Sequence, residues 1–225
     1  MNSRNRRTRV TSPHLLRALV VGLVLAWAAA RADDKVVLAA ARSFPDGGGY
    51  DGGSGGHGVP EDVVHKGTVI LSKAKSRRGS YCCGFTFAVV MKAAAWKGLL
   101  ADKTVAQVRR FQQEWYGATK ASRERQCAMA VVNLGIGREV KLKDARPGDC
   151  MILCRANSSG HSVVFLGWVW KARRRVGIRY RSSQPYTKGI GDLTEYFAGL
   201  DGRTQGIDPK RTHVARLSKG RRKAR

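Results

Sequence analysis

Three helices are predicted in the middle of the chain from the spacing of its apolar residues. Residues 83–100 are apolar on nearly every side, which is typical of a helix buried at the centre of a domain. Residues 104–116 place valine and aromatic side chains near one face at helical spacing, and Gly117 provides a stop. A third helix over 121–134 is predicted to end at Gly135 in a left-handed cap.

After Gly135 the pattern changes to short β-branched and aromatic runs separated by turns, which predicts strands. The predicted strands cover residues 150–154, 162–170, 176–183 and 212–217. A short helix is expected over 189–200, and residues 63–71 are compatible with either a helix or a strand. Helices followed by strands predict an α+β fold, in which N-terminal helices pack on a C-terminal antiparallel sheet.

Residues 1–32 have the pattern of a secretory signal peptide. A start with four arginines precedes an apolar run over 18–30, and Ala30-Arg31-Ala32 provides small residues at the two positions that a signal peptidase reads. We expect cleavage before Asp33 and export to the periplasm, the cell envelope or the medium. An uncleaved anchor is the alternative, but about 13 apolar residues are short for the roughly 20 that span a bilayer.

The remaining chain divides into three parts by composition. Residues 33–58 are predicted to be a leader and linker, because glycine dominates residues 47–56. Residues 59–218 have the pattern of one globular domain, which agrees with the chain length of 225 residues. Residues 219–225 form a basic tail.

The charge of the chain is strongly positive. Against 16 acidic residues stand 42 lysines and arginines, which gives a formal net charge of +26. Such a field attracts polyanions, and we expect the basic surface to bind anionic polymers of the cell envelope. No specific nucleic-acid partner is expected, and the protein is expected to be a monomer. The alternative is that solvated faces are simply rich in arginine.

Five cysteines are an odd number, so at least one thiol is free or pairs between molecules. Cys150 and Cys154 lie on one predicted strand about 13 Å apart, too far for a disulfide, and are better explained as small buried hydrophobes. The adjacent Cys82 and Cys83 do not have the spacing of a zinc site. We therefore expect no disulfide scaffold, no metal and no cofactor.

Candidate chemistry lies in Cys82 and in His161, which is 79 residues downstream. Cys82 is predicted at the start of a helix, where unpaired N–H groups and the helix dipole favour a thiolate. His161 opens a predicted strand after a polar turn. A cysteine at a helix start that meets a histidine on a strand is the arrangement of papain-like nucleophilic catalysis. The alternative is that both residues are structural.

Three motifs resemble a known family. Tyr-Cys-Cys-Gly-Phe at 81–85 is similar to the Asp-Cys-Ser-Gly-Leu nucleophile motif of NlpC-type cell-wall cysteine peptidases. Arg-Pro-Gly-Asp at 146–149 resembles their Lys-Pro-Gly-Asp turn, and residues 159–167 resemble their histidine strand. The order also suits the related cysteine, histidine-dependent amidohydrolases/peptidases, the CHAP domains. This resemblance covers about residues 78–192 and implies a papain-like fold and hydrolysis of amide bonds in the peptide part of peptidoglycan.

The resemblance also implies roles for individual residues. Cys82 becomes the nucleophile because Gly84 follows two residues later, where it would leave room for a substrate. Cys83 stands where the family has serine, which is a departure. His161 becomes the general base, and the polar residue that orients it matches Gln184 first and Ser182 second. The oxyanion would be held by backbone N–H groups at the helix start, such as that of Cys82, with help from Tyr81.

Other functions and other residues remain as alternatives. The protein is either a hydrolase, a non-catalytic secreted module that binds polyanions or cell wall, or an acyltransferase that uses the same dyad. His65 and His213 have no partner pattern and are interpreted as surface or structural histidines. Trp168 and Trp170 alternate along a strand and are expected in the core rather than in ligand stacking.

Overall fold

The computed structural model describes residues 35–52, 57–73, 79–117, 119–120, 122–200 and 204–218. Asp33–Arg225 form one compact unit. The predicted signal peptide and the basic tail over 219–225 lie outside the described residues, so both remain predictions. Within the described part, no helix is long and apolar enough to cross a membrane.

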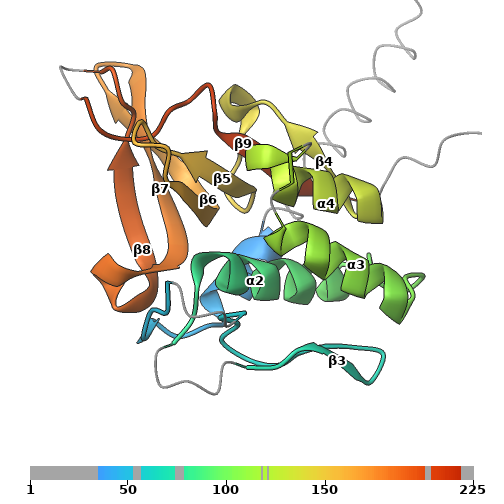
Figure 1. The fold of residues 1–225 in the computed structure, drawn as a ribbon. Coiled ribbons are helices and arrows are strands. Elements are labelled where there is room, and N and C mark those ends of the chain that lie inside the picture. The colour runs from blue at the N-terminus through green and yellow to red at the C-terminus, as the bar shows by residue number, and fades with distance from the viewer. Residues whose placement is uncertain are drawn as a thin grey trace, which may run out of the picture. The chain divides into compact units, whose positions relative to one another are not determined.

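Three longer helices lie together beside the large sheet (Figure 1). They are α2 (Cys82–Trp96), α3 (Val105–Tyr116) and α4 (Gln126–Leu134), and a shorter helix spans 35–42. The buried central helix is confirmed, since 11 of the 15 residues of α2 are buried, but it ends at Trp96 rather than at residue 100. Helix α3 begins with a capping box, in which Thr104 and Gln107 each accept a hydrogen bond from the backbone of the other.

The third helix differs from its prediction at one end only. A 3-10 turn over Arg123–Arg125 precedes α4, so the regular helix begins at Gln126. Its end is confirmed, because Gly135 has a φ of 73° and the left-handed conformation that closes a helix.

Seven strands form one sheet, in which every strand pairs antiparallel with its neighbours. Their order is β1-β8-β7-β6-β5-β9-β4. The strands are β1 (Gly47–Gly48), β4 (Gly137–Val140), β5 (Cys150–Cys154), β6 (Gly160–Lys171), β7 (Arg174–Gln184), β8 (Gly189–Tyr196) and β9 (His213–Leu217). A separate hairpin joins β2 (Val63–His65) to β3 (Thr68–Leu71). The α+β class with an antiparallel sheet is therefore confirmed, and residues 63–71 are strands.

The short helix expected over 189–200 is wrong. Residues Gly189–Tyr196 form β8, which pairs with β7 along its whole length, from Gly189 against Gln184 to Tyr196 against Gly177. The glycines at 189 and 191 disfavour a helix, and the open edge of β7 offers backbone partners that a local pattern does not reveal.

The sheet buries apolar side chains on both faces. Neighbouring residues of β5 go to different cores: Cys150 packs with the helices, whereas Met151 and Leu153 belong to a cluster on the other face. The segment that follows β8 contributes Phe197 and Ile207 to this second cluster. As expected, Cys150 and its neighbour at 154 are buried small residues, and all five cysteines are free thiols.

The Arg-Pro-Gly-Asp turn ends in a buried ion pair. The Asp149 carboxylate accepts from the Arg146 backbone N–H at 2.8 Å, which closes the turn. It also accepts from Arg216 of β9 at 2.8 and 2.7 Å, in a two-point contact between buried side chains. The motif therefore joins the start of β5 to the neighbouring strand β9.

The prediction that residues 33–58 are a linker is wrong for the described residues. The helix over 35–42 and the residues after it bury four apolar side chains in the main core: Val37, Ala40, Ala41 and Phe44. Gly47 and Gly48 then pair with β8 as β1. The glycines at 47, 48 and 49 all have φ values near +82°, so here glycine permits a defined path that other residues would strain to follow.

A buried arginine fastens this segment to the sheet. Arg181 of β7 donates to the backbone oxygens of Ala41 and Phe44 at 3.1 and 2.8 Å. Its guanidinium also contacts the carboxylates of Asp46 and Asp192 at 2.5 and 3.0 Å. A guanidinium has five donors in one rigid group. Arg181 can therefore bind several acceptors of residues 41–46 at once, although this segment lies more than 130 residues before β7 in the chain.

We predict that Phe44→Ala lowers the free energy of unfolding by about 3 kcal/mol, because a large aromatic side chain that is 2% exposed leaves a cavity. Chemical denaturation measures the change. Val64→Ala is the matched control, since Val64 is 52% exposed and its truncation should cost less than about 0.5 kcal/mol. Equal small effects of both substitutions would restore the linker interpretation.

Candidate functional site

The start of α2 is fixed by backbone contacts rather than by a capping side chain. Tyr81 is extended, with φ −116° and ψ 156°, and its carbonyl accepts the first helical hydrogen bond, from Phe85 N at 2.8 Å. The N–H groups of residues 82–84 therefore have no acceptor within the helix. Cys82 is the first helical residue, as the sequence predicted.

Glycines bring a second segment against this helix start. The Tyr81 N–H donates to the Gly58 carbonyl at 2.9 Å. A Cβ atom on Gly84 would lie 2.3 Å from the carbonyl oxygens of His57 and Gly58. The expectation that Gly84 leaves room for a substrate is therefore wrong, because the backbone of residues 57–58 fills that space.

Hydroxyl groups tie the helix start to β6 and β7. Thr86, one turn after Cys82, lies 2.6 Å from the Ser162 hydroxyl of β6. The Ser80 hydroxyl donates to the Ser183 hydroxyl of β7 at 2.8 Å, and Ser183 donates back to the Ser80 carbonyl at 3.0 Å. All four side chains are buried, so these bonds are shielded from water.

His161 and Gln184 meet between the two strands. The Gln184 Oε1 atom lies 3.0 Å from His161 Nε2, and both side chains are buried. Since an amide oxygen only accepts, Nε2 carries the ring proton and donates it, which leaves Nδ1 as the basic nitrogen. Ser182, the second match, instead donates its hydroxyl to the Ser162 carbonyl at 2.6 Å. The structure therefore brings Gln184, and not Ser182, to the imidazole.

The environment of Cys82 favours its thiolate. A hydrogen bond from the Cys83 thiol lowers the Cys82 pKa well below its ordinary value. Burial opposes this, and a hydrogen bond and charge from His161 and the Ser162 N–H lower the pKa further. The pKa of Cys83 is raised well above its ordinary value by the same contact, so Cys83 stays a thiol and a donor.

Tyr81 adds a phenol next to the sulfur. The charge of the Cys82 thiolate, burial and a hydrogen bond to Cys82 raise the Tyr81 pKa, so its hydroxyl remains a donor. In the sequence, Cys83 stood out only as a departure from a family motif. Nothing there predicted that its thiol donates a hydrogen bond to Cys82. Polar residues inside apolar runs, such as Thr86 and Ser162, were the available signal for the hydroxyl contacts.

A cavity of about 480 Å³ opens beside the histidine. His161, Gln184, Tyr180 and Tyr50 contribute to its lining, and Gln184 Nε2 is a buried donor without a hydrogen-bond partner. Cys82 is not among the lining residues and is only 3% exposed. The cavity therefore reaches the imidazole and the amide, while the sulfur is covered.

One wall of the cavity contains an ion pair. Arg155 makes a two-point contact with Glu195, at 2.5 and 2.8 Å, and Tyr180 donates to the same carboxylate at 3.1 Å. The pair leaves the wall polar without a net charge. It was not predicted from the sequence, because Arg155 and Glu195 lie 40 residues apart.

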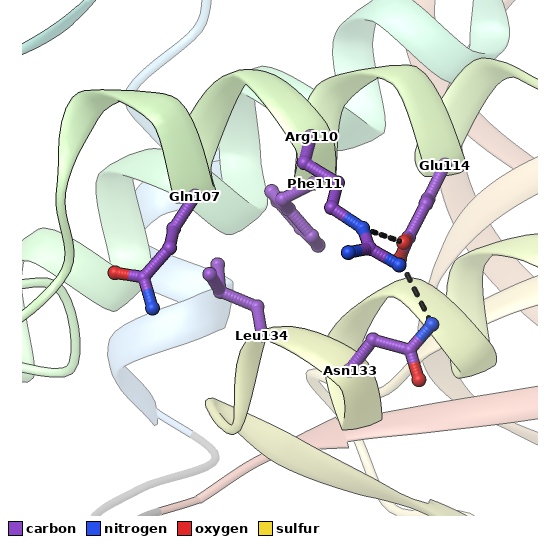
Figure 2. A pocket seen from close by; sticks show the side chains of 6 residues that line it. All are labelled: Gln107, Arg110, Phe111, Glu114, Asn133 and Leu134. Carbon is purple, nitrogen blue, oxygen red and sulfur yellow. Dashed lines mark hydrogen bonds and ion pairs between the residues drawn. The ribbon is translucent and has the colours of Figure 1, made fainter.

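A second hollow lies between α3 and α4 (Figure 2). Its polar groups are already paired: Arg110 Nε donates to Glu114 at 2.9 Å, and Asn133 donates to the other oxygen of Glu114 at 2.9 Å. The remaining labelled side chains, Gln107, Phe111 and Leu134, supply no nucleophile or imidazole. This hollow is not a candidate catalytic site.

His65 and His213 have structural partners, as expected. His65 Nε2 lies 2.9 Å from the Lys103 carbonyl, and His213 Nδ1 lies 3.2 Å from Glu139. Among the described residues, no group of three or more histidine, cysteine, aspartate or glutamate side chains is arranged to hold a metal ion.

Comparison with known proteins gives no relative: no protein-family model, curated protein or solved structure matches the chain.

We predict that Cys82 is alkylated fastest of the five thiols and stays reactive at pH values well below its ordinary pKa. A lowered pKa means that the thiolate persists as the pH falls, so removal of a donor raises the midpoint of the rate profile. Cys83→Ala and His161→Ala should both raise it, whereas Cys83→Ser, which keeps a donor, should raise it less. Iodoacetamide labelling with peptide mass analysis measures the rates.

Cys154 is the internal control for this experiment, because burial raises its pKa to about 11. It should react slowly until the solution is strongly alkaline. Labelling of Cys82 no faster than Cys154 at neutral pH would contradict the thiolate.

Proposed function

We propose that the protein is an exported cysteine hydrolase of papain-like arrangement that cleaves amide bonds in the peptide part of peptidoglycan. The observation that carries the proposal is the 3.0 Å contact of His161 Nε2 with Gln184 Oε1, at a site where His161 also helps to lower the Cys82 pKa. A thiol with a lowered pKa and an imidazole that is oriented by an amide oxygen have the composition of a papain-like triad.

The reaction follows from these contacts. His161 Nδ1 takes the Cys82 proton, and the thiolate attacks the amide carbonyl to form a tetrahedral intermediate. The Cys82 N–H, in the first turn of α2, stabilises the oxyanion, and the Tyr81 hydroxyl is a second available donor. His161 then protonates the leaving amine, and a water activated by the imidazole hydrolyses the thioester and frees the thiol.

Support for a wall substrate comes from the motifs and the charge. The three motifs resemble those of the cell-wall peptidases in the same order, and the predicted signal peptide leads to the compartment of the wall. The cavity beside His161 combines tyrosines with a neutral ion pair and an unpaired amide donor, which suits a polar peptide with carbonyl acceptors. The basic surface complements anionic envelope polymers.

One observation favours a second candidate, a binding module without catalysis. The Cys82 side chain is covered and does not line the cavity, so hydrolysis requires the side chains around the sulfur to move. In this candidate the cavity binds a peptide while Cys82 remains unreactive.

Hydrolysis of purified wall peptides, followed by mass spectrometry, separates the two candidates. We expect Cys82→Ala to abolish turnover and His161→Ala to reduce it by at least about 10²-fold. Gln184→Ala should reduce kcat less strongly, since it loses orientation rather than the base itself. Cys150→Ala is the matched control, because Cys150 is equally buried but lies among apolar residues.

Binding of wall peptides without cleavage, together with slow labelling of Cys82, would contradict hydrolase activity and favour the binding module. Cleavage that survives Cys82→Ala but not Cys83→Ala would move the nucleophile by one residue.

A further inference from the structure

The hairpin turn that joins β6 to β7 carries a cluster of basic residues. Four of its five residues over 171–175 are basic, and all five are exposed. No acidic residue occurs between positions 166 and 181. The neighbouring 3-10 turn, which Arg175 contacts through the Lys143 carbonyl at 2.6 Å, holds two lysines, at 141 and 143, against Asp144.

An exposed tryptophan stands in this cluster. The sequence placed both Trp168 and Trp170 in the core, and this is wrong for Trp170, which is 57% exposed. The ring centres of Trp168 and Phe165 lie 5.0 Å apart, and Trp168 packs against the second apolar cluster, which contains Met151 and Leu153. Trp170 points the same way but lies nearer to the turn, where the core has ended.

Arg175 holds Trp170 in place. Its guanidinium lies 4.2 Å from the centre of the Trp168 ring and 5.2 Å from that of Trp170. The ladder shifts register between Val169 and Trp170, which brings Arg175 opposite Trp170 and onto the face of both rings. An exposed ring that is pre-ordered in this way loses little entropy on binding.

The backbone of the turn is also unusual. Ala172 and Arg173 have φ values of 46° and 65°, the left-handed region that two-residue hairpin turns require and that glycine or asparagine normally occupies. An arginine at the tip therefore occupies a backbone conformation that is costly for its residue type, and such strain clusters at functional positions.

We propose that residues 168–175 are a docking site for the surface of a membrane that contains anionic lipids. An aromatic ring with a polar N–H, surrounded by lysine and arginine, matches the interface of such a bilayer. The tip of a hairpin is convex, so it fits a flat surface better than a single strand of nucleic acid, which needs a groove and successive stacking rings. Charge complementarity selects anionic over neutral lipid.

This docking would orient the candidate site. His161 is the second residue of β6 and Gln184 is the last of β7, so both lie at the opposite end of the hairpin from the turn. Ten residues of strand separate the site from the tip by roughly 30 Å. A protein docked by residues 168–175 would therefore hold its site away from the bilayer. Docking by residues 168–175 does not depend on catalysis at the candidate site.

Vesicle binding tests the proposal. The full chain and, in parallel, the chain beginning at Asp33, which is a compact unit, are sedimented with vesicles of phosphatidylcholine alone or mixed with phosphatidylglycerol. We expect binding only to the mixed vesicles, weakened at about 1 M salt, where the screening length is about 3 Å. Trp170→Ala and the pair Arg173→Glu/Arg174→Glu should each weaken it about tenfold or more.

Matched controls keep the result specific. Trp96→Ala removes an equally exposed tryptophan from the end of α2, and Arg109→Glu/Lys120→Glu makes the same change in net charge elsewhere. Brominated lipid should quench the wild-type fluorescence more than that of Trp170→Phe. If the control pair Arg109→Glu/Lys120→Glu weakens vesicle binding as much as Arg173→Glu/Arg174→Glu does, net charge alone explains the binding and the docking site is overturned. Stronger Trp170-dependent binding to a single-stranded oligonucleotide than to vesicles would overturn it in favour of nucleic acid.

Discussion

The hydrogen bond between Thr86 and Ser162 fixes where α2 meets the sheet, and the candidate site depends on this position. It joins two buried hydroxyl groups, and the Thr86 hydroxyl also lies 3.0 Å from the Cys82 carbonyl, so the same group links the first turn of α2 to β6. Cys82 lies one helical turn before Thr86, and His161 directly precedes Ser162. The same bond that docks the helix therefore also places the thiol next to the imidazole.

The five thiols show how strongly position controls the chemistry of one residue type. Burial raises the pKa of Cys127, Cys150 and Cys154. Cys82 is also buried, yet donors at the helix start and the neighbouring imidazole overcome the desolvation and lower its pKa. Cys83, one residue away, has a raised pKa because it donates to Cys82. The fold thus singles out one thiolate.

Two buried arginines connect parts of the chain that apolar packing alone would not align. Arg216 joins β9 to the turn before β5, and Arg181 joins β7 to the segment over 41–46. Each guanidinium is matched by carboxylates and backbone oxygens, which offsets the cost of its burial. Strand β7 is consequently fixed to the N-terminal segment. Gln184 lies at one end of this strand and the basic turn at the other.

The sequence by itself determined the local elements and the order of the candidate residues. The all-round apolar pattern of α2, the cap at Gly135 and the β5 run are local features, and local backbone preferences suffice to produce them. The sequence also paired Cys82 with His161, because a helix start and a strand start are recognisable contexts. Only the tertiary structure decided between Gln184 and Ser182, since the Ser182 hydroxyl is taken by the Ser162 carbonyl. It also turned residues 189–196 into a strand, packed four apolar side chains of residues 37–44 into the core and left Trp170 outside it. These outcomes depend on partners far away in the chain, such as the edge of β7 and the guanidinium of Arg181, which no local pattern contains.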